Sequence, residues 1–185
     1  MTQDHFAAFQ GHKCLARGDL PSVAVAIKIA NPPETVIVLS DLTGKPVDLD
    51  LRGSPDEVAA RYAPTGGVAP PKARRGRPKL GVLPREVTLL PRHWDWLAGQ
   101  TGGASAALRR LVEQARRDNS GKDAQRDAQE VAHRALSTLA GDLPNYEEAL
   151  RAFYAQDAAR YAVLIAAWPQ DIRTYLDERT AAAWA

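Results

Sequence analysis

Apolar positions in the first third of the chain switch between helical and strand spacing. Asp19-Leu20-Pro21 combines a helix N-cap with a proline just inside the helix, and apolar residues then recur at helical spacing. The β-branched stretch 35–39 and the strictly alternating stretch 46–51 each predict a strand. Ser54-Pro55-Asp56-Glu57 is a capping box, which predicts the start of a further helix. Residues 1–63 are therefore predicted to form a small α/β domain.

From residue 82 onward the pattern predicts an extended stretch followed by helices only. Residues 82–90 favour an extended backbone, Pro91 opens a short helix to about residue 98, and a second helix is predicted at about 105–117. Asp118-Asn-Ser-Gly-Lys122 has the composition of a loop and predicts a break. Three apolar stripes at helical spacing follow, so residues 118–185 are predicted to form a helical module.

The stretch between these parts has the composition of a linker. Residues 64–81 are rich in Pro, Gly and Arg, which cannot build an apolar core. The chain is thus predicted to have four parts: the α/β domain, the linker, a central segment at 82–117, and the helical module. The fold class that this order predicts is α+β.

Charge is unevenly distributed along the 185 residues. The whole chain carries 24 Lys and Arg against 22 Asp and Glu, but residues 70–117 alone carry 11 basic and 3 acidic residues. The parts before and after this stretch are net acidic. Concentrated positive charge attracts a polyanion, and nucleic acid is the common one.

The sequence offers little for metal, redox or membrane chemistry. The single Cys14 cannot form an internal disulfide, and the four histidines have no metal-ligand spacing. No apolar run approaches the ~20 residues of a membrane helix, and the first ten residues lack the pattern of a secretory signal. Asp48 and Asp50 are more typical of the solvated side of a hairpin than of a metal site, and Cys14 with His12 lacks an identifiable third partner for a nucleophile. We therefore expect no enzyme, no cofactor and no metal, in a cytoplasmic protein without membrane contact.

A short basic run in the linker has the composition of a minor-groove arm. In Arg74-Arg75-Gly76-Arg77-Pro78-Lys79 the glycine permits close backbone approach and the proline favours an extended course. Its arginines suit the negative potential of a narrow A·T-rich minor groove. The run resembles the Arg-Gly-Arg-Pro core of the AT-hook, which implies DNA contact by all six residues.

Residues 85–117 resemble the ribbon-helix-helix family of DNA-binding proteins. The resemblance lies in a short strand ending in Leu90-Pro91, a first helix with one apolar stripe, a glycine-containing turn, and a second amphipathic helix. The second helix places four apolar residues on one face, namely Leu108, Leu111, Val112 and Ala115. One strand and two helices cannot bury these faces alone. The resemblance implies an intertwined homodimer whose two strands pair into a ribbon that enters the major groove.

The same resemblance assigns DNA-contact roles by position. Arg85 and Thr88, on the outward side of the strand, are expected to read base edges. Ser105 is expected to cap the second helix, whose free amides offer a site for a phosphate. The further phosphate-contact candidates are Arg92, Arg109 and Arg110.

One departure from the family pattern leaves the strand register open. Leu89 and Leu90 are adjacent, whereas strict alternation would separate them by a polar residue. Either the strand carries a bulge or its register shifts by one residue. In the second case Val87 and Leu89 face the groove in place of Thr88.

The whole chain also resembles an uncharacterised bacterial protein family of about this length. The matching stretches are Arg-Gly-Arg-Pro-Lys-Leu-Gly, Glu-Val-Thr-Leu-Leu-Pro-Arg-His-Trp and the closing Ala-Ala-Trp-Pro-Gln-Asp-Ile-Arg. This resemblance implies a bacterial source and supplies no activity.

Three classes of function remain open on the sequence alone. The first is a DNA-binding protein, either a dimeric regulator or a nucleoid-type protein, with double-stranded DNA and a second copy of itself as partners. The second is a protein-interaction adaptor with a basic docking linker. The third, an enzyme with its site in the N-terminal unit, has only isolated polar residues in its favour. We expect the first.

Overall fold

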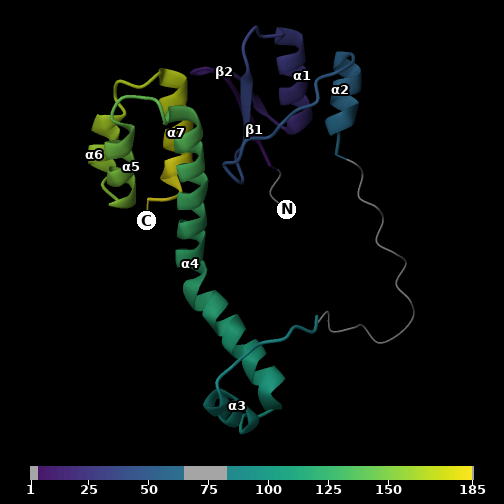
Figure 1. The fold of residues 1–185 in the computed structure, drawn as a ribbon, viewed down its shortest axis with the longest axis vertical. Helices are drawn as coiled ribbons and strands as arrows, with labels where there is room; N and C mark the ends of the chain where they lie inside the picture. The colour runs from purple at the N-terminus through teal and green to yellow at the C-terminus, as the bar shows by residue number, and fades with distance from the viewer. Residues whose placement is uncertain (1–3, 65–82, 185) are drawn as a thin grey trace. The chain divides into compact units, whose positions relative to one another are not determined.

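The chain is an α+β protein in the computed structural model, which describes residues 4–64 and 83–184 (Figure 1). Its elements in chain order are β1 (Phe6–Gln10), β2 (Lys13–Gly18), α1 (Leu20–Ala30), β3 (Val36–Ser40), α2 (Pro55–Tyr62), α3 (Pro91–Ala98), α4 (Gly103–Ala140), α5 (Tyr146–Tyr154), α6 (Ala158–Leu164) and α7 (Gln170–Ala181). The described residues fall into two compact units. Residues 4–64 and 122–184 form the mixed unit, and residues 83–121 form the hairpin unit.

The mixed unit contains a three-stranded antiparallel sheet in the order β2-β1-β3. β1 and β2 form a hairpin whose turn contains Gly11 at a φ of 53°, a conformation that glycine adopts without a steric penalty. Successive residues of β1 point to opposite faces of the sheet, as strand geometry requires. Ala7 and Phe9 face one core, and Ala8 faces another. The sheet is therefore covered on both faces.

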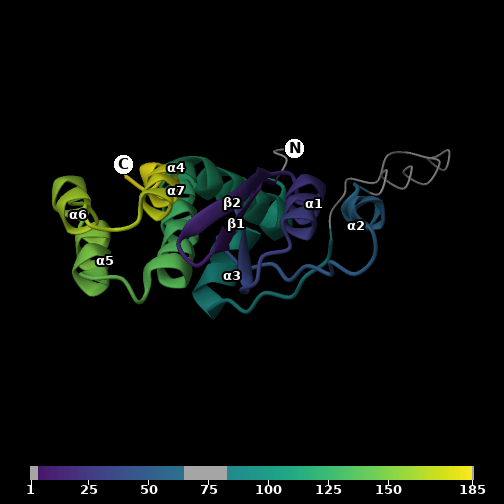
Figure 2. The ribbon, with the colours of Figure 1, turned by 90° about the horizontal axis from the view of Figure 1, so that it is seen from above.

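Helices from different parts of the chain cover the two faces of the sheet. On one face, Ala8 and Val38 of the sheet contact Val23 and Ile27 of α1. On the other face lie helices from the C-terminal part of the chain, and Figure 2 shows β1 and β2 with α1 on one side and α7 on the other. The sheet is thus the middle layer of the mixed unit.

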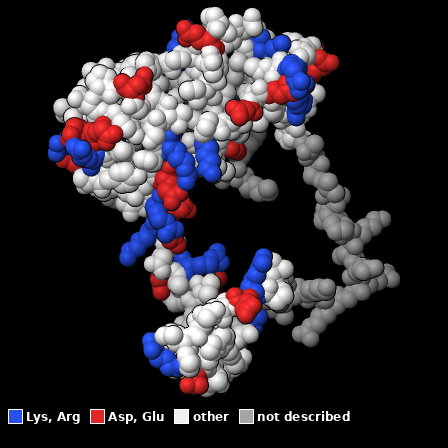
Figure 3. All heavy atoms as spheres, in the orientation of Figure 1, with Lys and Arg blue, Asp and Glu red and all other residues white. Residues whose placement is uncertain are grey.

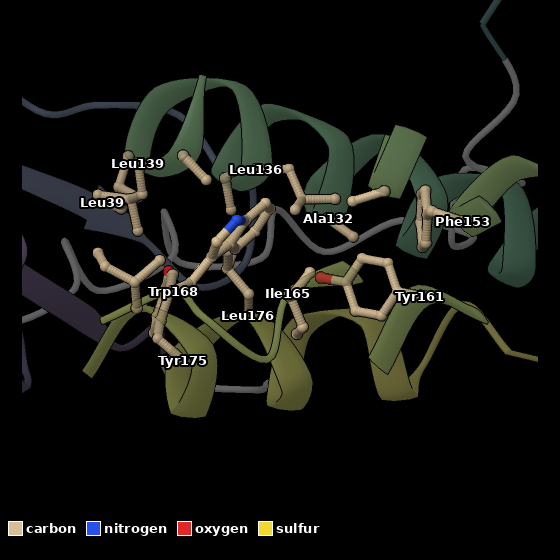
Figure 4. Packing of buried hydrophobic residues seen from close by; sticks show 14 of the residues in the cluster. Leu39, Ala132, Leu136, Leu139, Phe153, Tyr161, Ile165, Trp168, Tyr175 and Leu176 are labelled. Carbon is tan, nitrogen blue, oxygen red and sulfur yellow. The ribbon is translucent and has the colours of Figure 1, made fainter. Parts of the chain in front are cut away.

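The larger core joins the first and last parts of the chain. Phe9 and Leu39 of the sheet are fully buried together with Leu136 of α4 and Leu176 of α7. Figure 4 shows Leu39, Leu136 and Leu176 in this core. The rings of Phe9 and Tyr175 meet edge to face at 5.2 Å between centroids. The sequence pattern predicts residues 1–63 and 118–185 as separate modules, whereas the structure places them in one core.

The predicted helix starts of the mixed unit are confirmed. The Asp19 side chain accepts a hydrogen bond from the Ser22 amide at 3.1 Å at the start of α1. Ser54 and Glu57 form the reciprocal bonds of a capping box at the start of α2. Both signals are local, so tertiary contacts do not override them.

The strand predicted at 46–51 is wrong. Only Pro46 bridges to β3, opposite Leu39, and the Val47 amide donates to the Val38 carbonyl at 2.8 Å. Beyond this point the Arg61 side chain donates a hydrogen bond to the Asp50 carbonyl. Leu49 packs against the apolar cluster that includes residues of α1. The chain leaves the edge of the sheet because these contacts replace the backbone hydrogen bonds that a further strand would make with β3.

The break predicted at 118–122 is also wrong, because α4 runs without interruption from Gly103 to Ala140. Gly121 is helical and takes none of the positive φ values that end helices at glycine. Gln114 donates to Asp118 at 2.7 Å and Asn119 donates to the Ala115 carbonyl at 2.9 Å, both across one turn. These side chains bond along the helix instead of ending it.

Candidate nucleic-acid interface

The hairpin unit contains the two helices that the sequence predicts. Residues 83–90 carry no strand pairing within the single chain, and Leu90 has the extended φ and ψ of −68° and 150°. Pro91 then occupies the first position of α3. A tight turn ending in Gly102, at a φ of 84°, leads into α4. Because α4 begins at Gly103, Ser105 lies inside its first turn and is not the capping residue that the sequence predicts.

The hairpin unit buries very little of its apolar surface. Leu97 and Ala107 are its buried residues, each about 2% exposed. Large apolar side chains remain open to solvent, with Trp96 at 55%, Leu111 at 48% and Val112 at 58% exposure. The others are Leu83, Val87, Leu90 and Trp94. Exposure of so many large apolar groups in one small unit is typical of a surface that another molecule covers.

An open hollow of about 1420 Å³ lies between the extended stretch and the start of α4. Its apolar lining includes Val87, Trp96 and Leu111. Its charged lining consists of five arginines and one acid: Arg85, Arg109, Arg110, Arg116, Arg117 and Glu113. We call these six residues and the space they enclose the arginine hollow. A concave surface with one dominant sign of charge concentrates the opposite charge.

Local bonds hold some of these arginines and leave others available. Arg110 donates to the Thr101 carbonyl at 3.1 Å, which ties α4 to the preceding turn. Arg116 pairs with Glu113 at 3.1 Å, and Arg117 donates to Gln114 at 3.2 Å. Among contacts between described residues, the hydrogen-bonded or ion-paired arginine side chains of the hollow are these three, and the side chains of Arg85 and Arg109 make no such contact. One carboxylate thus offsets part of the charge of five guanidinium groups.

The mixed unit holds a second charged cluster with a different character. Tyr175 donates to Asp41 at 3.0 Å, and Arg179 pairs with the same carboxylate at 3.3 Å. Arg17 forms a bidentate pair with Glu178. Burial, followed by the charge of Asp41, raises the pKa of Tyr175. Every charge here has a partner within the unit, so the cluster joins the sheet to α7.

The weak candidates of the N-terminal segment have structural partners. The Cys14 amide donates to Asp171 at 2.9 Å, and burial raises the pKa of the Cys14 thiol, which disfavours the reactive thiolate. Hydrogen bonds from Arg52 hold the pKa of the Asp50 carboxyl well below its usual range. Among residues 4–64 and 83–184, no group of three His, Cys, Asp or Glu side chains is placed to hold a metal ion.

Over the same described residues, no helix has both the length and the apolar character needed to cross a membrane.

Comparison with known proteins gives one match. Residues 5–180 match the family described as "Uncharacterized protein conserved in bacteria (DUF2239)". The chain belongs to the DUF2239 family. The predicted resemblance of the whole chain to an uncharacterised bacterial family is thereby confirmed. Comparison with curated proteins and with solved structures gave no match.

The DUF2239 match spans both units, and its description states no activity. The predicted contact residues of this family member fall into three groups. Arg85, Ser105, Arg109 and Arg110 line the arginine hollow. Thr88 and Arg92 are exposed but do not line it. The run predicted as a minor-groove arm, residues 74–79, lies outside the described residues.

Two of the five lining arginines are not among the predicted contacts. Arg116 and Arg117 repeat Arg109 and Arg110 after seven positions, which is close to two helical turns. This repeat is visible in the sequence. It becomes meaningful only when the helix continues past residue 117, and the sequence pattern predicts that it ends there.

Proposed function

We propose that this DUF2239 protein binds double-stranded DNA as a homodimer, acting as a regulator or a nucleoid-type protein. The observation that carries the proposal is the arginine hollow beside an apolar face that a single chain leaves open. The first feature suits a polyanion and the second suits another protein surface.

A second copy of the hairpin unit is the proposed cover for the apolar face. Leu111 and Val112 of α4 lie near Val87 of the extended stretch around the same hollow, and all three are about half exposed. Residues 83–90 have an extended course, and the backbone groups of residues 83–89 make no backbone hydrogen bond to a described residue. Pairing two such stretches would satisfy these groups and bury the apolar side chains of both copies.

The proposed ribbon presents its outward side chains to the major groove, as the ribbon-helix-helix resemblance implies. Arg85 would donate hydrogen bonds to the major-groove edge of a guanine, and Thr88 would contact the neighbouring base. Arg92, Ser105, Arg109 and Arg110 would contact phosphates. The Arg-Gly-Arg-Pro run at 75–78, with its flanking Arg74 and Lys79, would add a minor-groove arm.

Two sets of substitutions test this arrangement in the full chain. Arg75→Ala with Arg77→Ala should flatten the slope of log K against log salt by about 1.8 per chain, because about 0.9 is lost per phosphate charge. It should also remove any preference for A·T-rich flanks. Arg85→Ala should relax the choice at one base position, at a cost of about 1–3 kcal/mol. Fluorescence anisotropy with labelled duplexes measures all three effects.

Arg126→Ala provides a matched control for these variants. Arg126 is an exposed arginine of α4 in the mixed unit and is paired with Asp123 at 3.3 Å. Its removal should leave both slope and base preference unchanged. If the arm variant behaves like this control, residues 74–79 do not contact DNA. If the wild-type protein binds an acidic protein but no duplex, the adaptor function replaces the proposal.

A further inference from the structure

The unbroken course of α4 brings a second pair of arginines onto the face that already carries Arg109 and Arg110. We propose that Arg116 and Arg117 form a second phosphate-binding row, which extends the DNA contact along α4 past Arg109 and Arg110 to the last residues of the ribbon-helix-helix-like segment. This inference rests on the proposed function and adds a contact surface that the family resemblance does not imply.

Helix geometry places the two arginine pairs on the same side of α4. At 100° per residue, positions 109, 110, 116 and 117 fall within about 120° of arc. The apolar residues Leu108, Leu111 and Ala115 fall on the opposite side of the helix. Leu108 and Leu111 also reach the wall of the hollow that the arginines line, so the proposed dimer forms at the apolar part of this wall and leaves the arginine part open in each copy.

The second pair is accessible in the structure. Every residue from 111 to 122 is exposed, so no described residue covers this part of α4. The side chain of Arg116 is 73% exposed although it pairs with Glu113. Figure 3 shows blue and red side chains together along the uncovered part of α4. An exposed ion pair of this kind contributes little stability, so a phosphate can compete for the guanidinium.

The spacing of the pairs suits separate phosphates. Seven residues of α-helix rise about 10.5 Å, whereas successive phosphates of one strand rise about 3.4 Å along the DNA axis. One phosphate cannot serve both pairs. Arginine forms bidentate hydrogen bonds with phosphate oxygens, so each pair can hold its own group on the backbone.

Glu113 lies between the two pairs and opposes the binding of an anion. Its carboxylate is held by Arg116 at 3.1 Å and is the one acid that lines the hollow. Glu113→Gln removes this negative charge with little change in shape. If phosphates occupy the row, this variant should bind duplex DNA several-fold more tightly at about 0.1 M salt.

The decisive comparison uses two double variants of the full chain with the same loss of charge. Arg116→Ala with Arg117→Ala removes the row, whereas Lys122→Ala with Arg126→Ala removes two charges on the opposite side of α4. Alanine is the best helix former, so both variants should keep the helix intact, which circular dichroism checks. Binding to a labelled duplex is measured by anisotropy over a range of salt concentrations.

We expect the row variant to flatten the slope of log K against log salt by about 1.8 per chain, and to lose at least about tenfold in affinity at 0.1 M salt. The control variant should change neither. Equal slopes for the two variants, or no gain for Glu113→Gln, would overturn the second row and leave the proposed function standing. Absence of duplex binding by the wild-type protein would overturn both.

Discussion

At the scale of single residues, Tyr175 connects the sheet to the last helix through several contacts at once. Its ring packs edge to face on Phe9, and the guanidinium carbons of Arg17 and Arg179 each lie 5.4 Å from the ring centroid. Its hydroxyl donates to Asp41 at 3.0 Å. Because burial raises the pKa of Tyr175, the phenol remains a donor across the physiological pH range.

Removal of this hydroxyl should weaken the mixed unit measurably. Tyr175→Phe leaves the ring in place but takes one donor from a largely buried carboxylate, which should lower the free energy of unfolding by about 1–2 kcal/mol. Urea unfolding measures the change. Tyr154→Phe is the matched control, since Tyr154 is about half exposed and its hydroxyl makes no hydrogen bond to a described residue. Equal effects of the two variants would show that the Asp41 bond contributes nothing.

The neighbouring pair of Arg17 and Glu178 predicts a response to acid. The hydrogen bond from Arg17 lowers the pKa of Glu178 below its ordinary value of 4.5. The pair therefore stabilises the fold fully above that value and progressively less as the pH falls below it. Both side chains are more than a third exposed, so the contribution is below about 1 kcal/mol. Glu178→Gln should reduce stability at pH 7 and reduce it less as the pH falls below 4.5; an equal loss at neutral and acid pH would contradict this account.

At the scale of elements, residues that act within their own helical turn predict the structure well. Contacts between elements that are distant in the chain cannot be predicted from the spacing of apolar and polar residues. The starts of α1, α2 and α3 follow from Asp19, Ser54 and Pro91, because each acts on its own first turn. The loss of the strand at 46–51 depends on Arg61, a side chain of another element. The sequence pattern cannot show such a contact.

The candidate site was predictable in part for the same reason. Arg109 and Arg110 are predicted contacts because the family resemblance assigns contacts near the start of the second helix. Arg116 and Arg117 lie at the end of the same segment and are not predicted, because Asp118 to Lys122 has the composition of a loop and the helix is expected to end beside them, whereas α4 continues through it. Side-chain bonds within α4, such as Gln114 to Asp118, support this continuation.

The continuity of α4 can be tested at Gly121. A methyl group added to Gly121 meets no atom within 4 Å, and alanine favours an exposed helix over glycine by about 1 kcal/mol. Gly121→Ala should therefore slow amide hydrogen exchange around residues 115–125 about fivefold, as native-state exchange experiments measure. Unchanged or faster exchange would show that this stretch is not helical in solution.

At the scale of the whole molecule, the shared core changes which experiments are informative. Phe9 and Leu39 lie in the same core as Leu136 and Leu176, so deletion of the first 69 residues would open that core. Loss of DNA binding by such a fragment would follow from misfolding alone. Substitutions on exposed positions of the hairpin unit avoid this problem.

The proposed dimer predicts a large effect at Leu111. Leu111→Asp would place an unpaired charge in the interface between two copies, at a cost of several kcal/mol, and should convert a dimer into a monomer. Light scattering measures the mass. Val163→Asp on α6 is the control, since Val163 is 75% exposed in the mixed unit and should leave the dimer intact. A wild-type protein that is already monomeric would contradict the ribbon.

The central claim is that two copies of this chain together bind duplex DNA through arginine–phosphate contacts. The most direct test is a salt titration of wild-type binding to random and A·T-rich duplexes, with the stoichiometry measured in the same samples. Six phosphate contacts from Arg92, Arg109 and Arg110 of two chains predict a slope of log K against log salt of about −5 or steeper. The account also predicts two chains per site. A slope near zero, or no duplex binding at low salt, would contradict it.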